Sequence, residues 1–208
     1  MDLERYQCII FDFDGVIVDS MAIRDEGFKK VLKNFGDDNV IRLLKYHREN
    51  AGLSRYNKFR YFYENILNKP VTEEAINNLA EKFSKIMREL LIDKSLLIDD
   101  SLLFIQRQYK NIPLYIASGS DQRELRYLCG KLGIDKYFIE IYGSPTAKPD
   151  LIKKIIEENK YRAESAVVVG DSHNDREAAK LNGAMFWGYN NEALCGDETP
   201  YISSFKLL

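Results

Sequence analysis

The sequence predicts an α/β fold in which a parallel β-sheet carries an inserted all-helical segment. Three observations support this prediction. Short apolar runs typical of buried strands recur along the chain, helical patterns separate the later runs, and a long stretch without strand-like alternation separates the first two. Strands that alternate with helices of this length form βαβ units, whose strands run parallel.

Five apolar runs rich in β-branched or aromatic residues predict the strands. They span residues 8–13, 113–118, 138–142, 166–170 and 184–188. Between the later runs, apolar residues at helical spacing predict helices over 123–132 and 150–159. Each run is followed by a cluster of turn-forming residues, as expected for strands that end in loops.

Residues 21–91 are predicted to form the inserted all-helical domain. A βαβ unit takes roughly 30 residues, whereas about 100 residues separate the first two predicted strands. Within the insert, apolar side chains recur at helical spacing over 28–35, 59–66 and 76–90. Thr72, which precedes Glu73, is the expected N-cap of the last of these helices. The core would then comprise residues 1–20 and 92–208.

The composition is that of a globular protein without a strong charge. With 208 residues, 45% of them hydrophobic, the chain can bury a sizeable core and is long enough for one domain with an insert. The net charge of -2 lacks the basic excess of proteins that bind nucleic acid or anionic membranes. We therefore expect neither partner, and any anion site should be local.

The cysteines and the apolar runs indicate a cytoplasmic location. Cys8, Cys129 and Cys195 are odd in number and show no CxxC spacing, so neither a disulfide framework nor a zinc site is predicted. The chain from Met1 onward shows no basic segment followed by a long apolar one. The longest apolar runs are far shorter than the roughly 18 residues that a membrane span needs.

Carboxylates follow the first and fourth predicted strands. Asp12 and Asp14 end the first strand, where a turn at Gly15 can direct both side chains to one point. Asp171 and Asp175 follow the fourth strand. In open α/β sheets ligands bind outside the carboxyl ends of the strands, so these acids are candidate site residues. Taken alone, Asp-x-Asp-Gly is equally an acidic loop that merely solvates a strand end, and the spacing of a calcium loop is not met.

Groups suited to phosphate follow the other strands. Ser118 and Gly119 offer a hydroxyl and backbone N–H groups after the second strand, and Lys148 is a single cation held in place by Pro149. Mg²⁺ prefers oxygen ligands and keeps substrate phosphate in its coordination shell. One hydroxyl, one lysine and several carboxylates at neighbouring strand ends therefore predict a site for phosphate and Mg²⁺.

Four motifs in this order resemble those of the haloacid dehalogenase superfamily, in its phosphatase branch with a helical cap after the first motif. They are Asp12-Phe13-Asp14-Gly15-Val16, Ser118-Gly119, Lys148-Pro149 and Gly170-Asp171-Ser172-x-x-Asp175. The resemblance covers nearly the whole chain and implies a Rossmann-like core with a helical cap. Within the superfamily the chain is similar to phosphoglycolate phosphatases and β-phosphoglucomutases.

The resemblance also implies a role for each matched residue. Asp12 would attack phosphorus and become an aspartyl phosphate, and Asp14 would protonate the leaving oxygen and then take a proton from water. Mg²⁺ would bind to Asp12, Asp171 and the backbone carbonyl of Asp14, with Asp175 acting beside it. Three groups would hold the phosphoryl oxygens: Ser118, the Gly119 N–H and Lys148.

The sequence departs from the family pattern in two places. Leu151 stands where a second proline often follows the Lys-Pro pair, which affects a loop more than the chemistry. Arg24 stands twelve residues after Asp12, where β-phosphoglucomutases have a histidine, and this weakens the mutase interpretation. The dehalogenases of the superfamily lack an acid corresponding to Asp14, so its presence favours phosphoryl transfer.

The segment 42–60 is rich in basic residues and contains a single acid. Its cations are Arg42, Lys45, Arg48, Arg55, Lys58 and Arg60. They either cover a solvated helix face or, together with Arg24, include residues such as Arg55 that bind a second anionic group of the substrate. The sequence Gly52-Leu53-Ser54-Arg55 would then be the substrate loop, whereas His47 is expected at the surface.

We therefore predict a Mg²⁺-dependent phosphatase that hydrolyses a small phosphorylated metabolite, a sugar or sugar-acid phosphate, through an aspartyl phosphate. A phosphosugar mutase and a non-catalytic binding protein are the alternatives. The expected partner is a small-molecule phosphate ester, and we expect a monomer or a weak homodimer.

Overall fold

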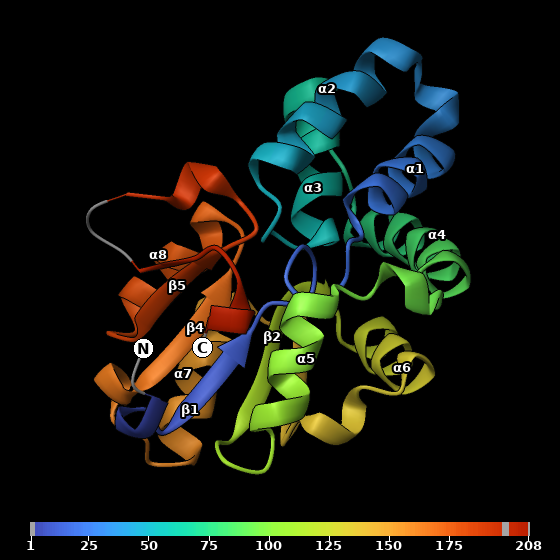
Figure 1. Ribbon diagram of the computed structural model, residues 1–208. Helices are drawn as coiled ribbons and strands as arrows, with labels where there is room; N and C mark the ends of the chain where they lie inside the picture. The colour runs from blue at the N-terminus through green and yellow to red at the C-terminus, as the bar shows by residue number, and fades with distance from the viewer. Residues whose placement is uncertain (1–2, 197–199, 208) are drawn as a thin grey trace.

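The structure is a computed structural model that describes residues 3–196 and 200–207. The strands within these residues are β1 (Cys8–Phe11), β2 (Leu114–Asp121), β3 (Glu140–Ser144), β4 (Ala166–Gly170), β5 (Met185–Tyr189) and β6 (Tyr201–Ile202). They form one sheet in the order β3-β2-β1-β4-β5-β6, and each neighbouring pair is parallel (Figure 1). The predicted parallel α/β core is confirmed.

Eight α-helices occur in the described residues. They are α1 (Met21–Leu32), α2 (Asp37–Glu49), α3 (Arg55–Tyr61), α4 (Glu73–Leu90), α5 (Asp99–Gln108), α6 (Gln122–Leu132), α7 (Lys148–Glu158) and α8 (His173–Leu181). Figure 1 shows α1 to α4 gathered together beyond the end of β1. These four helices lie within the predicted insert, and the division into a core of 1–20 and 92–208 and a cap of 21–91 stays a prediction.

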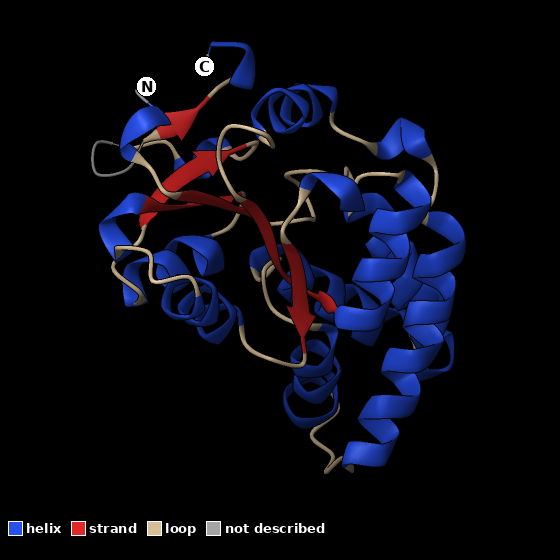
Figure 2. Ribbon diagram, turned by 90° about the horizontal axis from the view of Figure 1, so that it is seen from below, coloured by secondary structure: helices blue, strands red, loops and turns tan. Residues whose placement is uncertain are grey.

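The central strand β1 is buried on both faces, which explains its uninterrupted apolar sequence. Ile9 and Phe11 belong to a core cluster that includes residues of α5 and α6. Cys8 and Ile10 face the opposite cluster, which includes residues of α7 and α8. Successive side chains of a strand point to opposite faces, and a parallel sheet is normally covered on both (Figure 2). β1 thus ends between β2 and β4, at the middle of the sheet.

The second strand is longer than the sequence indicates. β2 continues through Ser118 to Asp121, with irregular pairing to β3 between Ala117 and Asp121. The prediction of a turn directly after Ser118 is therefore wrong. The chain turns after Asp121 instead. The Asp121 carboxylate caps α6 by accepting hydrogen bonds from the N–H groups of Arg123 and Glu124, each at 3.0 Å.

The helical segment has its own aromatic core. Phe28 of α1 contacts Phe59 of α3 and Phe83 of α4, with ring centroids 5.4 and 4.5 Å apart. The Thr72 hydroxyl accepts a hydrogen bond from the Ala75 N–H at 3.2 Å, which confirms the predicted N-cap of α4. Among the described residues, no helix combines the length and the apolar character needed to cross a bilayer.

Candidate active site

The strand register brings the predicted site residues to one edge of the sheet. Phe11 of β1 pairs with Ile116 of β2 and with Val169 of β4. All three strands run in the same direction, so the residues that follow these partners emerge together. Three of the predicted site residues follow in this way: Asp12, Ser118 and Asp171.

Asp12 is held in a fixed and buried position. Its side chain is 4% exposed, and one carboxylate oxygen accepts a hydrogen bond from the Phe13 N–H at 2.7 Å. The same oxygen lies 3.0 Å from the Lys148 ammonium. Burial raises the pKa of Asp12 to about 7, because the charge of Lys148 does not fully offset the loss of water and the neighbouring carboxylates.

The Asp175 carboxylate is paired with Lys148. The carboxylate is fully buried and forms an ion pair with Lys148. Its other oxygen accepts hydrogen bonds from the N–H and the hydroxyl of Ser172, at 3.1 and 2.7 Å, which closes a capping box at the start of α8. Although burial opposes it, the two carboxylates raise the pKa of Lys148, so its ammonium stays charged between Asp12 and Asp175.

The carboxylates form a group suited to a divalent cation. Oxygens of Asp12, Asp171 and Asp175 lie within 4.8 Å of one another. Burial and the charge of Asp175 raise the pKa of Asp171, and its buried Oδ1 lacks a hydrogen-bond partner among residues 3–196 and 200–207. Oxygen donors and clustered negative charge are what Mg²⁺ requires, so these residues fit that ion.

Gly15 fixes the turn that follows the two aspartates of the first motif. Its φ of +75° lies in the left-handed region, where a side chain is strained, and a Cβ atom there would collide with the Asp171 carboxylate. The Gly15 N–H donates to the Val18 carbonyl oxygen at 2.8 Å. The absence of a side chain at this position therefore lets the turn rest against Asp171.

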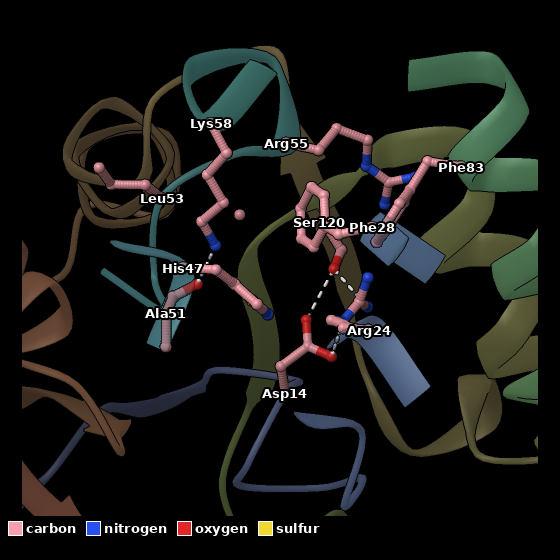
Figure 3. A pocket seen from close by; sticks show the side chains of 11 residues that line it. Asp14, Arg24, Phe28, His47, Ala51, Leu53, Arg55, Lys58, Phe83 and Ser120 are labelled. Atoms are coloured by element: carbon pink, nitrogen blue, oxygen red, sulfur yellow. Dashed lines mark hydrogen bonds and ion pairs between the residues drawn. The ribbon is translucent and has the colours of Figure 1, made fainter. Parts of the chain in front are cut away.

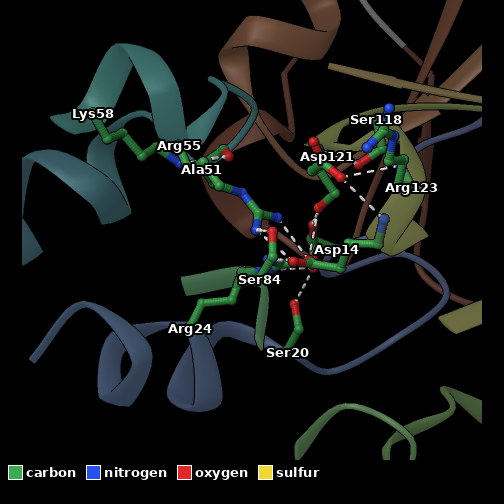
Figure 4. Close-up of polar contacts among 12 residues, drawn as sticks. Asp14, Ser20, Arg24, Ala51, Arg55, Lys58, Ser84, Ser118, Asp121 and Arg123 are labelled. Atoms are coloured by element: carbon green, nitrogen blue, oxygen red, sulfur yellow. Dashed lines mark hydrogen bonds and ion pairs between the residues drawn. The ribbon is translucent and has the colours of Figure 1, made fainter. Parts of the chain in front are cut away.

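The Asp14 side chain binds a different set of partners from Asp12. Its oxygens accept hydrogen bonds from the Ser20 hydroxyl, from Arg24 Nε at 2.6 Å and from the Ser120 hydroxyl at 2.7 Å (Figure 4). Burial alone would raise the pKa of Asp14, but Arg24 and the two hydroxyls lower it. Asp14 is therefore ionised in this arrangement.

The two arginines expected to bind substrate are paired with buried carboxylates. Arg24 contacts Asp14 and donates to the Ser120 hydroxyl at 2.8 Å, and one of its Nη atoms lies 3.5 Å from Glu124. Arg55 forms a two-point ion pair with Glu124, with one contact at 2.6 Å, and donates to Ser84 of α4. Because α6 supplies Glu124, Arg55 links the helical segment to the sheet domain across the site.

We expect Arg55→Met to lower the free energy of unfolding by about 3–5 kcal/mol, because it leaves the fully buried Glu124 carboxylate with a weakened set of partners. Chemical denaturation followed by circular dichroism measures this change. Arg60→Met is the matched control on α3, since its ion pair with Glu73 is exposed and should contribute less than about 1 kcal/mol. Equal effects for the two variants would contradict the structural role of Arg55.

The loop after α2 rests directly on the core motifs. A Cβ atom at Gly119 would lie 2.5 Å from the Gly52 carbonyl oxygen. A Cβ atom at Gly52 would lie 2.8 Å from the Ser172 hydroxyl and 2.9 Å from the Asn174 side chain. Only glycine permits these approaches, so the loop lies directly against Gly119 of β2 and the start of α8.

We expect Gly52→Ala to lower kcat/KM by about tenfold or more, because the added methyl group displaces the loop from the site. Steady-state kinetics on the preferred phosphate ester measures the loss. Gly130→Ala in α6 is the control, since a Cβ atom there meets no described atom within 4 Å and should leave activity unchanged. Wild-type kinetics in Gly52→Ala would show that this contact does not matter for turnover.

A cavity lies between the helical segment and Asp14 (Figure 3). Its volume is about 20 Å³, and its polar lining includes Arg24, His47, Arg55 and Lys58. The basic segment is thus divided between its two helices. Arg55 and Lys58 of α3 are buried, whereas the cations of α2 are exposed: Arg42, Lys45 and Arg48. The exposed cations fit a solvated helix face, whereas substrate binding by the buried ones stays a prediction.

The prediction that His47 lies at the surface is wrong, and several residues of the site were not predicted. His47 is 2% exposed, because α2 turns it inward against Phe28, with ring centroids 4.9 Å apart. Ser120 and Glu124 join the site through hydrogen bonds that span 106 and 69 positions, which leaves no local pattern. Ser20 lies six positions after Asp14, to which its hydroxyl donates. Lys58 did leave a signal, because it precedes the buried Phe59 on the inward face of α3.

Comparisons with known proteins agree with this arrangement. The sequence model of the family described as haloacid dehalogenase-like hydrolase matches residues 9–188. A phosphorylated carbohydrates phosphatase from Thermotoga maritima is 26% identical over 85% of this chain and 82% of its own length. Phosphoglycolate phosphatase 1 from Pseudomonas aeruginosa is 24% identical over 93% of this chain and 74% of its own length.

Solved structures show the same fold. A β-phosphoglucomutase from Clostridium difficile superposes with a TM-score of 0.81 at 18% identity, covering 98% of this chain and 93% of the other. The family match and the two curated relatives confirm the prediction of an enzyme of the phosphatase type. The motifs at the strand ends, the fold and the match over residues 9–188 lead to one conclusion: the chain belongs to the haloacid dehalogenase-like hydrolase family.

Proposed function

We propose that this protein is a Mg²⁺-dependent phosphatase that hydrolyses a small phosphorylated metabolite, a sugar or sugar-acid phosphate, through an aspartyl phosphate at Asp12. One observation carries the proposal: Asp12 lies buried at the end of the central strand, 3.0 Å from Lys148 and next to Asp171 and Asp175. A carboxylate nucleophile beside a fixed cation is the arrangement that phosphoryl transfer to a side chain needs.

In the first step Asp12 acts as the nucleophile. An Asp12 oxygen forms a bond to phosphorus while the bond between phosphorus and the ester oxygen breaks, and the departing oxygen takes a proton from the acid form of Asp14. Lys148 offsets the repulsion between Asp12 and the anionic phosphoryl group. The Ser118 hydroxyl and the Gly119 N–H hold phosphoryl oxygens at the end of β2.

In the second step Asp14 acts as the base. Water attacks phosphorus and gives a proton to Asp14, and the bond between phosphorus and Asp12 breaks to release inorganic phosphate. The ion pair with Arg24 keeps Asp14 ionised, which suits this step. The first step requires a proton on Asp14, so we propose that Asp14 leaves Arg24 when the substrate enters.

Asp12, Asp171 and the backbone carbonyl of Asp14 would hold the Mg²⁺ ion, with Asp175 fixing the neighbouring Lys148. When bound, Mg²⁺ neutralises part of the negative charge that the carboxylates and the phosphoryl group bring together. The unpartnered Asp171 Oδ1 and the raised pKa values of Asp12 and Asp171 support this assignment.

The closed loop and the relatives support a small substrate. The approach of Gly52 to Gly119 covers the phosphate-binding end of β2 and leaves little room for a macromolecule. One curated relative is named for phosphorylated carbohydrates and another for phosphoglycolate, which are small phosphate esters. The cytoplasmic location and the monomeric or weakly dimeric state stay predictions.

A phosphate-release screen tests the proposed function. The panel comprises sugar phosphates, sugar-acid phosphates, phosphoglycolate and nucleotides, each assayed with Mg²⁺. We expect release from sugar or sugar-acid phosphates and little from nucleotides. Formation of an isomerised sugar phosphate without net release of inorganic phosphate would show that the protein is a mutase. No turnover of any compound would favour a non-catalytic binding protein.

A further inference from the structure

Lys58 is a buried cation without a carboxylate partner. Its side chain extends from α3 into the cavity of Figure 3 and is 3% exposed. The ammonium donates one hydrogen bond, to the Ala51 carbonyl oxygen at 3.0 Å. In the described part of the chain no carboxylate lies within 4.0 Å of it, whereas Arg24, Arg55 and Lys148 all have such partners.

His47 is a second unsatisfied group in the same cavity. It is 2% exposed, and within the described residues neither ring nitrogen has a hydrogen-bond partner. Burial, with the nearby charge of Lys58, lowers the pKa of His47 to about 2, so the ring is neutral and offers one N–H donor and one acceptor. Buried polar groups without partners are rare. The nearest carboxylate to His47 among the described residues is that of Asp25, whose Oδ1 lies 3.9 Å from Nε2, beyond hydrogen-bond distance.

The charges that line the cavity do not balance. Arg24 and Arg55 are offset by Asp14 and Glu124, whereas no carboxylate of the described residues lies within 4.0 Å of the Lys58 ammonium. Burial, together with the charge of Arg24, therefore lowers the pKa of Lys58 to about 7. Removing an ammonium group from water with one carbonyl as compensation is unfavourable. An anion beside Lys58 would relieve that cost. Asp14 lines the same cavity, so an anion bound there would lie close to the phosphate that reacts at Asp12 and Asp14.

We propose that Lys58 is the residue that determines specificity, by binding an oxyanion at the non-reacting end of the substrate while His47 contacts a neighbouring hydroxyl group. This inference rests on the proposed function and narrows its substrate class to phosphate esters with a second anionic group. The oxyanion is a carboxylate or a second phosphate. Arg24 and Arg55 were the sequence-based candidates for this task, but Arg24 contacts Asp14 and Arg55 joins the helical segment to α6.

Matched substrate pairs test the proposal. 6-Phosphogluconate has a carboxylate where glucitol 6-phosphate has a hydroxymethyl group. Fructose 1,6-bisphosphate has one phosphate more than fructose 6-phosphate. We expect the wild-type enzyme to prefer the more anionic member of at least one pair, and that pair identifies the oxyanion. Lys58→Met should reduce the kcat/KM ratio within this pair by about tenfold to a hundredfold, the effect of losing a charged hydrogen bond.

Lys45→Met is the matched control, because the Lys45 side chain on α2 is 79% exposed. The kcat/KM ratio of this variant should equal that of the wild type. Thermal unfolding checks the fold, and Lys58→Met should be at least as stable as the wild type because it removes an unpaired buried charge. A Lys58→Met ratio equal to that of the wild type would overturn the proposal. So would a wild-type enzyme that hydrolyses both pairs without preferring the anionic members.

A binding assay separates this inference from the proposed function. In an Asp12→Asn background, isothermal titration should show weaker binding of the more anionic ligand of the preferred pair after Lys58→Met and unchanged binding of its less anionic counterpart. Equal binding losses for both partners would overturn the role of Lys58. Absence of phosphate release from every compound would refute the phosphatase, and the binding assay would then decide the role of Lys58 by itself.

Discussion

Asp12→Asn is expected to abolish phosphate release, lowering kcat by about 10⁴-fold or more, because an amide cannot replace the carboxylate as the nucleophile. The substitution is nearly isosteric and retains the oxygen that accepts the Phe13 N–H hydrogen bond. Measuring initial rates with freshly purified protein excludes activity from Asn that has deamidated to Asp. Substantial activity in this variant would contradict the covalent mechanism.

The fold of the Asp12→Asn variant should remain intact. Burial disfavours the charge on Asp12, and Lys148 does not fully offset that cost together with the repulsion from Asp175 and Asp14, so the uncharged amide removes an unfavourable contribution. Thermal unfolding should therefore show a melting temperature no lower than that of the wild type. Asp135→Asn, at an exposed position distant in sequence from the motifs, is the matched control and should keep full activity. Loss of activity together with the fold would leave Asp12 without a demonstrated chemical role.

Removal of the divalent cation is expected to have the second largest effect. Excess EDTA should stop turnover, and Mg²⁺ should restore it, because the carboxylates of Asp12 and Asp171 require a counter-charge before an anionic phosphoryl group can approach. Ca²⁺ should inhibit, since its larger and more variable coordination shell distorts the geometry of in-line attack. Full turnover in excess EDTA would reject the metal assignment.

Asp171→Asn should raise the Mg²⁺ concentration needed for half-maximal activity by about tenfold to a hundredfold, because it removes one anionic ligand. Isothermal titration with Mn²⁺ as the probe gives a readout that does not depend on turnover. Asp150→Asn, an exposed acid in the first turn of α7, is the control. Equal Mn²⁺ affinity in the wild type and in Asp171→Asn would place the cation elsewhere.

Much of the core could be predicted from the sequence because local pattern and burial coincide there. The apolar run that begins at Cys8 is buried on both faces of a parallel sheet, so its strand leaves a clear signal. The ends of such strands meet at one edge, which is why Asp12 and Asp171 could be expected near each other. The short strand β6, with Tyr201 and Ile202 alone, lacks enough residues for any periodicity.

The cap side of the site could not be predicted in the same way. Arg55 meets Glu124 across 69 positions, and Arg24 meets Ser120 across 96, so these pairs arise from tertiary packing. The positive charges of segment 42–60 were visible in the sequence, but their orientation was not. Lys58 could have been identified, because it lies three residues after Arg55 and immediately before Phe59, on the face that packs inward.

The central claim is that the phosphoryl group passes through Asp12, and chemical trapping tests it most directly. The enzyme is mixed with a substrate from the screen and Mg²⁺, quenched in acid and reduced with borohydride, which converts an aspartyl phosphate to homoserine. Peptide mass spectrometry should find homoserine at position 12 and at no other aspartate, and none when the substrate is omitted. Phosphate release without homoserine at position 12, or with homoserine at another aspartate, would contradict the account.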